Sequence, residues 1–364
     1  MAIIFDKQLD NETLLLSYNN NTITFYSDTN VTNTKATVLF AGLIFTLFPD
    51  PLGKYHFNFK HSVSTLLNQN NFSDFVDLNT TFLIDYTGDI FRNIEIDFTI
   101  GFINNTTEST SYNYNFLSAF VNVQNYKKLY SNYPFDIEIQ MFLKPITYLK
   151  YWVGYPFDFT FYNGLRNDID ITVNGTLETY TNDKAINRIV VNNGNGSLGI
   201  VDDFAISNGY NRITVNDNSI DFEQITNSCE GHYLKWLNSF GGWNYWLFNK
   251  GNNTLTTKDT GIINNDYEDV VDSISPYVAI GKTSENNITI VQENITPEEF
   301  SILRDLLDSP KVYLYTGTYN EISVANDWLE VTIKSGAFRT SNAREKMTSL
   351  NLNIDLPMNT TKTL

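Results

Sequence analysis

One aromatic stretch, residues 229–248, limits most strongly what the chain can fold into. It reads CEGHYLKWLNSFGGWNYWLF and holds three of the five tryptophans. Two apolar runs meet at Gly241-Gly242, and only glycine adopts the positive φ of tight primed turns without strain. The stretch therefore predicts a β-hairpin whose strands meet at the two glycines.

Both faces of this hairpin are expected to be apolar. A loop made of the two glycines gives these cross-strand pairs: Phe240 with Trp243, Trp236 with Leu247, and Leu237 with Trp246. A solvated hairpin does not sustain two apolar faces, so we expect cover from the domain's own second layer or from another subunit. A row of exposed rings that stacks on sugars or bases is the third interpretation. The residues expected in the core hairpin or subunit contact are Trp236, Trp243, Tyr245, Trp246 and Phe248.

Composition favours strands over helices. The 364 residues include 26 Phe and 22 Tyr, and the chain is rich in Thr, Ile and Val, residue types that are enriched in strands. Within residues 93–102, apolar and charged or polar side chains alternate, which predicts a half-buried antiparallel strand. Short alternating segments with Asn/Gly-rich turns over residues 169–221 fit an exposed β-sandwich lobe. We predict an all-β protein made mainly of antiparallel β-sandwich domains.

Two helices are expected among these strands. Thr296 to Glu299 place Thr at a helix cap, Pro at the first helical position and Glu three residues after the cap, which is a capping box. Apolar residues follow at helical spacing until Ser309-Pro310 ends the pattern. We predict one capped amphipathic helix near residues 297–308 and a short helix near residues 62–69.

The length suits two domains. A second aromatic concentration, at residues 148–157, contains Gly154 and Pro156, which favour a crossing or hinge. We place an N-terminal β-rich domain at residues 1–155 and a C-terminal β-sandwich domain with the flanking helix at residues 156–364. Three local expectations complete the outline: a hairpin whose turn is PDPLGK at residues 49–54, a loop or hairpin tip at residues 103–115, and a polar, turn-rich segment at residues 252–265.

Charge and cysteine content narrow the function classes. The 41 acidic and 24 basic residues give a net charge of −17, which repels phosphate backbones, and no basic cluster interrupts it. We therefore do not expect nucleic-acid binding through charge. The single cysteine, Cys229, cannot form an intrachain disulfide. We expect it to be a small buried apolar residue rather than a nucleophile.

The sequence predicts a soluble protein that is synthesised in a cytosol. The N-terminal residues MAIIFDKQLDNETLLL lack the basic region, apolar core and cleavage site of a secretion signal. The apolar run at residues 38–48 is too short to span a bilayer. No membrane partner is expected.

No catalytic, metal or cofactor site stands out. The chain has three histidines, and none lies in a nucleophile elbow or a zinc-binding helix. His56 and His61 fall on opposite faces of a continued strand, and no carboxylate completes a ligand set. The NGNG segment at residues 193–196 lacks the lysine and helix of a phosphate-binding loop. We expect no enzymatic activity, no metal and no cofactor.

Four segments carry a resemblance to a known group of proteins. They are YLKWLNSFGGWNYWLF at residues 233–248, ITPEEFSILRDLLDSPKVYLY at 295–315, DWLEVTIKSGAF at 327–338 and LNLNIDLP at 350–357. Together they resemble tail-region virion proteins of tailed phages that infect Bacteroidota, of the distal-tail or baseplate-hub type. The similarity covers roughly the C-terminal third, with a weaker echo around PDPLGK.

The resemblance implies a β-sandwich with a flanking helix, assembled as a hexameric ring around the DNA channel beside other tail proteins. It also implies a place in the virion after synthesis in the bacterial host cytoplasm. An acidic channel lining would let DNA pass without sticking, which agrees with the net charge of −17. The alternative function is a carbohydrate-binding or adhesin β-sandwich module that contacts host-surface glycan, because aromatic residues and sandwich-like strands are abundant.

Overall fold

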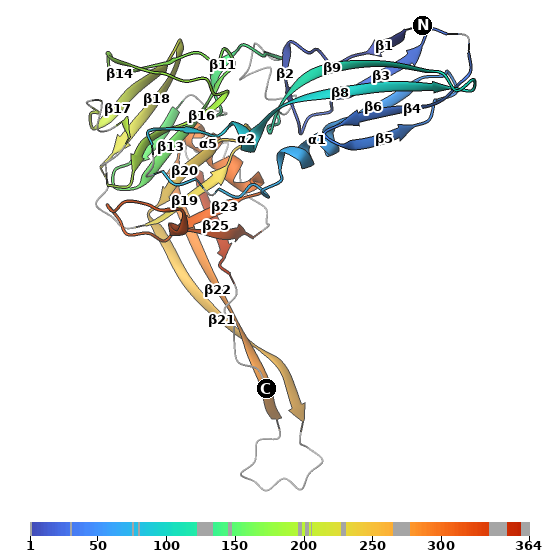
Figure 1. Cartoon of the computed structure of the whole chain (residues 1–364). Helices are drawn as coiled ribbons and strands as arrows, with labels where there is room; N and C mark the ends of the chain where they lie inside the picture. Colours follow the sequence, from blue (N-terminus) through green and yellow to red (C-terminus); the bar gives the residue numbers. More distant parts are fainter. Residues whose placement is uncertain are drawn as a thin grey trace.

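The computed structural model describes residues 2–357 except 30, 75, 79–80, 122–133, 145–147, 196–198, 201–203, 205, 227–230, 265–276 and 335–347. In this part of the chain, strands form five sheets with mainly antiparallel pairing, and short helices lie beside them (Figure 1). The prediction of an all-β protein is confirmed. Cys229 lies outside the described residues.

An N-terminal sandwich consists of a three-stranded and a six-stranded sheet. The smaller has the order β1 (Ile3–Lys7), β3 (Thr22–Ser27) and β6 (Tyr55–Asn58). The larger has the order β10 (Phe135–Asp136), β2 (Thr13–Leu16), β9 (Thr107–Leu117), β8 (Phe91–Phe102), β4 (Asn33–Phe40) and β5 (Leu43–Leu47). As predicted for residues 93–102, Ile96, Phe98 and Ile100 of β8 are fully buried, and they pack with residues of both sheets in one core.

Three further sheets share a second, larger core. The four-stranded sheet has the order β11 (Gln140–Phe142), β13 (Pro156–Asn163), β16 (Ile186–Asn193) and β7 (Leu83–Asp85). The five-stranded sheet has the order β12 (Tyr148–Trp152), β18 (Asn218–Ile225), β17 (Gly209–Val215), β14 (Ile169–Val173) and β15 (Thr176–Tyr180). The seven-stranded sheet has the order β20 (Trp243–Phe248), β19 (His232–Leu237), β23 (Val312–Tyr315), β24 (Trp328–Ile333), β25 (Thr348–Asp355), β22 (Tyr277–Ile295) and β21 (Lys250–Asn264).

The two large cores use different parts of the chain. One spans residues 23–116 and the other residues 149–354. A third, smaller cluster joins both parts, with Leu14 and Leu117 on one side and Tyr162 and Phe240 on the other. Strand β7 precedes the predicted boundary and pairs with β16 beyond it. The division at residue 155 stays a prediction.

The helices follow their sequence signals. Helix α5 spans Pro297–Asp308, and the backbone N–H of Glu299 donates to Thr296 Oγ1 at 3.2 Å while Glu299 Oε2 accepts from the Thr296 N–H at 2.8 Å. The predicted capping box is therefore present. Helix α1, Lys60–Leu67, begins two residues before the predicted short helix. Two shorter helical segments are α2, Thr87–Ile90, and the 3₁₀ turn η1, Ala325–Asp327.

The predicted PDPLGK hairpin is wrong. Strands β4 and β5 already form a tight hairpin at Ala41-Gly42, where both residues have positive φ (47° and 79°). Residues 49–54 then connect β5 to β6, which belongs to the opposing sheet. The apolar run at residues 36–48 continues through this turn, so hydrophobicity alone did not reveal that the chain reverses there.

Two segments that were predicted as loops are strands. Residues 107–117 form β9, which pairs along β8, so only residues 103–106 form the tip of that hairpin. Residues 250–264 form β21, which pairs with β22. Both strands carry many Thr, Ser and Asn residues, and a strand that leaves a polar face in solvent lacks a strong apolar signal.

The central hairpin is present as β19–β20, but the predicted register is wrong. Leu237 pairs with Trp243, Trp236 with Asn244 and Lys235 with Tyr245. Residues 238–242 form the loop, in which Asn238 Oδ1 accepts from the backbone N–H groups of Phe240 (2.8 Å) and Gly242 (3.2 Å). This side chain adds to the backbone bonds from Asn238 N–H to Gly242 O (2.8 Å) and from Gly241 N–H to Asn238 O (3.1 Å), and together they stabilise a five-residue loop.

Both glycines of the loop allow close approach of a neighbouring carbonyl oxygen. A Cβ at Gly241 would lie 2.8 Å from the Ser118 oxygen and one at Gly242 would lie 2.7 Å from the Leu143 oxygen. Gly241 also has a φ of 84°, in the left-handed region that favours glycine. A Gly-Gly pair therefore does not by itself identify a two-residue hairpin loop.

Candidate functional sites

The aromatic residues of the hairpin lie inside the protein. Their side chains are at most 4% exposed and pack on the chain's own sheets. Trp246 meets Trp152 edge to face at 5.2 Å between ring centroids, and Trp243 meets Tyr313 at 5.8 Å. The five residues placed in this way are Trp236, Trp243, Tyr245, Trp246 and Phe248. The chain itself covers both faces, so the hairpin presents no exposed stacking platform.

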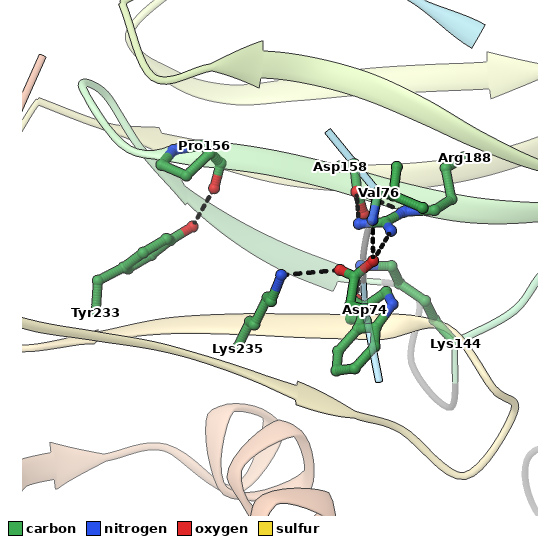
Figure 2. A network of polar contacts seen from close by, with 9 residues as sticks. Asp74, Val76, Lys144, Pro156, Asp158, Arg188, Tyr233 and Lys235 are labelled. Atoms are coloured by element: carbon green, nitrogen blue, oxygen red, sulfur yellow. Dashed lines mark hydrogen bonds and ion pairs between the residues drawn. The ribbon is translucent and has the colours of Figure 1, made fainter. Parts of the chain in front are cut away.

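A buried network of charges joins the hairpin to the β13–β16 pair (Figure 2). The Asp74 carboxylate accepts from Arg188 Nη1 at 2.7 Å and from Lys235 Nζ at 2.8 Å. Arg188 Nε also donates to Asp158 at 2.8 Å. All four side chains are at most 3% exposed. Arg188 thus bridges a carboxylate on its neighbouring strand and one from the segment between α1 and β7.

Pairing offsets the cost of burying these charges. Burial disfavours the ionised form of Asp74, but attraction to Arg188 and Lys235 outweighs it and holds the pKa of Asp74 below its usual range. Lys235 Nζ also lies 4.2 Å from the ring centroid of Trp328, a cation–π contact that favours its charge. Removing one partner of such a pair leaves an uncompensated buried charge. We interpret the network as an anchor for the hairpin.

Strands β21 and β22 form a long two-stranded arm (Figure 1). It projects from the edge of the seven-stranded sheet that lies opposite the β19–β20 hairpin. The part of the arm next to the body belongs to it, because β25 pairs with β22 from Asn287 to Ile295 and the side chains of Ile288 and Ile290 are buried. Further out, none of the side chains described at residues 251–263 and 279–287 is buried. The outer arm is therefore a ribbon exposed on both faces.

Several apolar side chains lie on this exposed ribbon. Leu255 is 61% exposed and Ile262 59%, and Ile263 and Ile280 are also exposed. A two-stranded ribbon alone in water is marginally stable, and the exposed Lys258–Glu285 pair at 3.5 Å adds little. Register shifts around Gly261 mark a bulge, which increases the local twist. A surface of this kind gains stability by contact with a partner.

A polar pocket opens between β12, β18, the end of β16 and the loop at residues 318–323. Its volume is about 260 Å³. The loop packs on two glycines, since a Cβ at Gly154 would lie 2.4 Å from the Tyr319 ring and one at Gly194 would lie 2.2 Å from the Glu321 carbonyl oxygen. Any larger residue at either position would push the loop away and open the pocket.

The histidines that were considered as metal ligands lie apart. His56 is on β6, with Nε2 3.1 Å from Asp50 Oδ2 and Nδ1 3.1 Å from Thr24 Oγ1, whereas His61 is on α1. Within the described residues, no group of three or more His, Cys, Asp or Glu side chains is arranged to hold a metal ion. In the same part of the chain, no helix has the length and apolar character needed to cross a membrane.

Comparisons with known proteins give no family. No family model and no curated protein sequence matches the chain. Several solved structures show weak likeness, among them three bacterial proteins. Fibronectin(III)-like modules of Clostridium thermocellum CbhA are 6% identical, with 61% of this chain and 94% of that chain covered and a TM-score of 0.21.

The second is a Ca²⁺-stabilised, ice-binding adhesin of an Antarctic bacterium, 11% identical, with 98% of this chain and 73% of that chain covered and a TM-score of 0.19. The third is SGBP-B of the Bacteroides ovatus mixed-linkage glucan utilization locus, in complex with a mixed-linkage heptasaccharide. It is 9% identical, with 97% of this chain and 71% of that chain covered and a TM-score of 0.17. TM-scores this low assign neither a fold family nor a function.

Sequence reasoning identified the hairpin residues but missed the other features. The arm could have been suspected from the β-branched residues in TLTTKDTGII and ITIV, at residues 254–263 and 288–291. The partners of the charge network, Asp74, Asp158, Arg188 and Lys235, are scattered along the chain and carry no local signal. The pocket depends likewise on five separate segments.

Proposed function

We propose that the protein is a structural subunit of a larger assembly and contacts its neighbours through the arm. The observation that carries the proposal is the ribbon of β21 and β22, which leaves the body with both faces exposed and with Leu255, Ile262 and Ile263 in solvent. Ile262, Ile263 and Ile280 lie close together on the outer ribbon, and exposed apolar patches mark interaction surfaces. Free strand edges of a ribbon also readily pair with another chain.

The sequence resemblance supplies the proposed setting, which is the tail of a phage. There the protein would be a ring or baseplate subunit, with copies of itself and other tail proteins as partners, and without enzymatic activity. A contact in which the arm of each copy reaches a different surface on the next is heterologous, and such contacts close into rings when the rotation allows it. The net charge of −17 suits a channel through which DNA passes.

Excision of the outer arm tests the assembly. Thr254 and Asn287 face each other in the ribbon, so an Asn-Gly turn can replace residues 255–286 and keep the pairing of β22 with β25. We expect the full chain to form an oligomer in native mass spectrometry, and the shortened protein to be monomeric while its melting temperature stays within a few degrees. A full chain that stays monomeric at high concentration, or a shortened chain that assembles equally well, would contradict the proposal.

Point substitutions provide a matched control. The double variant Leu255→Ser/Ile262→Ser removes apolar surface from the arm only. Its control, Ile103→Ser/Leu177→Ser, removes a similar amount elsewhere, since these residues are 69% and 57% exposed. Only the arm variant should weaken assembly, because only its side chains would be buried between subunits.

Carbohydrate binding, as a host-surface adhesin or binding module, is the second candidate function. The pocket beside Gly154 favours it, because its walls offer hydrogen-bonding groups and apolar contact in one place, as sites for small ligands do. The tryptophans of the hairpin would not take part, since they are buried. A glycan array with the full chain tests this function, and silence across host polysaccharides would count against it.

A further inference from the structure

The pocket beside Gly154 has a composition that selects for one kind of ligand. Its floor contains Tyr151 and Asn192, which are 1% and 4% exposed. Asn195 and Asn320 are exposed at its mouth, and Gln224 of β18 is half-buried. Every polar side chain of the described lining is thus an amide or a phenol, without formal charge.

This neutrality contrasts with the rest of the chain. The whole protein carries 41 acidic and 24 basic residues, yet none of them is among the residues of this pocket lining that the structure describes. A charged ligand would lose its hydration there without gaining an opposite charge. Amides offer both donors and acceptors, which suits a ligand whose hydroxyl groups do the same.

The hydrogen bonds at the floor fix the orientation of its groups. Asn192 Oδ1 accepts from the backbone N–H of Gly194 at 2.5 Å, and Asn192 Nδ2 donates to the Tyr151 hydroxyl oxygen at 2.5 Å. Because that oxygen already accepts a bond, the Tyr151 hydroxyl proton remains for donation. Burial raises the pKa of Tyr151, so the phenol keeps this proton at neutral pH. The floor therefore presents a fixed donor.

Apolar walls complete the pocket. Val153 and Ile206 line it beside the amides. A pyranose ring combines hydroxyl groups at its rim with C–H groups on its faces, so it matches both kinds of wall. The volume of about 260 Å³ is below the range of roughly 300–1,000 Å³ that holds drug-sized ligands, and it suits a single ring.

We propose that this pocket binds one ring of a neutral saccharide, held by Tyr151, Gln224 and Asn320. The inference rests on the second candidate function, carbohydrate binding, and is independent of assembly through the arm. To that candidate function the inference adds where the sugar binds, that one sugar ring is bound, and that the pocket discriminates against charged sugars.

Titration calorimetry and saturation-transfer NMR on the full chain test the site with glucose, galactose, N-acetylglucosamine and glucuronic acid. The informative variants are Gln224→Ala and Asn320→Gly. Asn320 has a φ of 61°, which glycine adopts freely, so the second variant removes the amide without straining the backbone. Asn105→Gly is the matched control, because Asn105 has a φ of 62° and lies in the distant β8–β9 turn.

We expect at least one neutral sugar to bind. Each pocket variant should lower the affinity for that sugar about tenfold, because a hydrogen bond is lost. The control should leave the affinity unchanged. Glucuronic acid should bind more weakly than the neutral sugars. Binding that persists in both pocket variants would overturn the site while leaving carbohydrate binding in place. If no sugar in the panel binds and a glycan array is also silent, both the site and the second candidate function fail.

Discussion

Two consecutive hairpins of this protein have the same antiparallel pairing but differ in how far their side chains are buried. The hairpin β19–β20 and the arm β21–β22 are both antiparallel, and they lie at opposite edges of one seven-stranded sheet. Every residue of β20 is buried, whereas the outer arm has no buried side chain among its described residues. Backbone pairing is common to both, so it does not explain the difference.

The difference lies in what covers the faces. In the hairpin, each buried aromatic or aliphatic side chain contributes about 1.5–3 kcal/mol, and Lys235 ties the strand to the charge network. The outer arm has cross-strand pairs alone, which contribute about 0.2–1 kcal/mol each. The hairpin therefore contributes to the stability of the body, whereas the outer arm contributes little.

The largest effect is expected at the anchor of the buried hairpin. Arg188→Met should lower the free energy of unfolding by about 3–5 kcal/mol, because Asp158 loses its cation and Asp74 loses one of two, both within the interior. Urea unfolding at pH 7 measures the loss. Arg212→Met is the control, since its pair with Asp221 is exposed and should contribute less than about 1 kcal/mol. Equal losses would mean that the network does not anchor the hairpin.

Cavity formation in the hairpin should be nearly as costly. Trp246→Ala removes a side chain that is 2% exposed and packs on Trp152, and we expect a loss of about 3–4 kcal/mol. In the arm, Leu255→Ala should change the stability of the monomer by less than about 0.5 kcal/mol. Thermal melts of both variants at low protein concentration measure the contrast. A melting temperature unchanged by Trp246→Ala would contradict the conclusion that the hairpin stabilises the body more than the arm does.

A smaller, pH-dependent effect is expected where α5 meets the hairpin loop. Burial raises the pKa of Asp305 to about 6, against the opposing effect of its hydrogen bonds to Ser239. The unfolded carboxyl has a pKa of about 3.9, so between about pH 4 and 6 the folded state retains a proton that the unfolded state releases. Stability from this group is therefore lost as the pH rises through that interval.

Asp305→Asn should remove this loss, because the amide stays neutral. We expect the variant to be more stable than the unaltered protein by about 1–2 kcal/mol at pH 7, and to show no gain at pH 4. Asp259→Asn, in the exposed arm, is the control for the loss of one negative charge. A gain of the same size at both pH values would point to packing rather than to charge.

Local sequence patterns predicted the elements that local forces determine. The bounds of α5 match the predicted 297–308 because the cap, the proline and the apolar spacing all lie within that segment. The need to bury both faces of the hairpin likewise followed from its own residues. The register did not, because it depends on how the Asn238 side chain and the Leu143 carbonyl oxygen meet the loop.

The amino-acid sequence by itself determined an all-β protein, the capped helix and an aromatic hairpin whose two faces must be buried. These features follow from propensity and periodicity, which act between near neighbours. Only the tertiary structure decided which carboxylates neutralise Arg188, that the arm leaves the body, and that Tyr151, Gln224 and Asn320 surround one uncharged pocket. These features join residues that are far apart in the chain. Their energies depend on distances that no local pattern specifies.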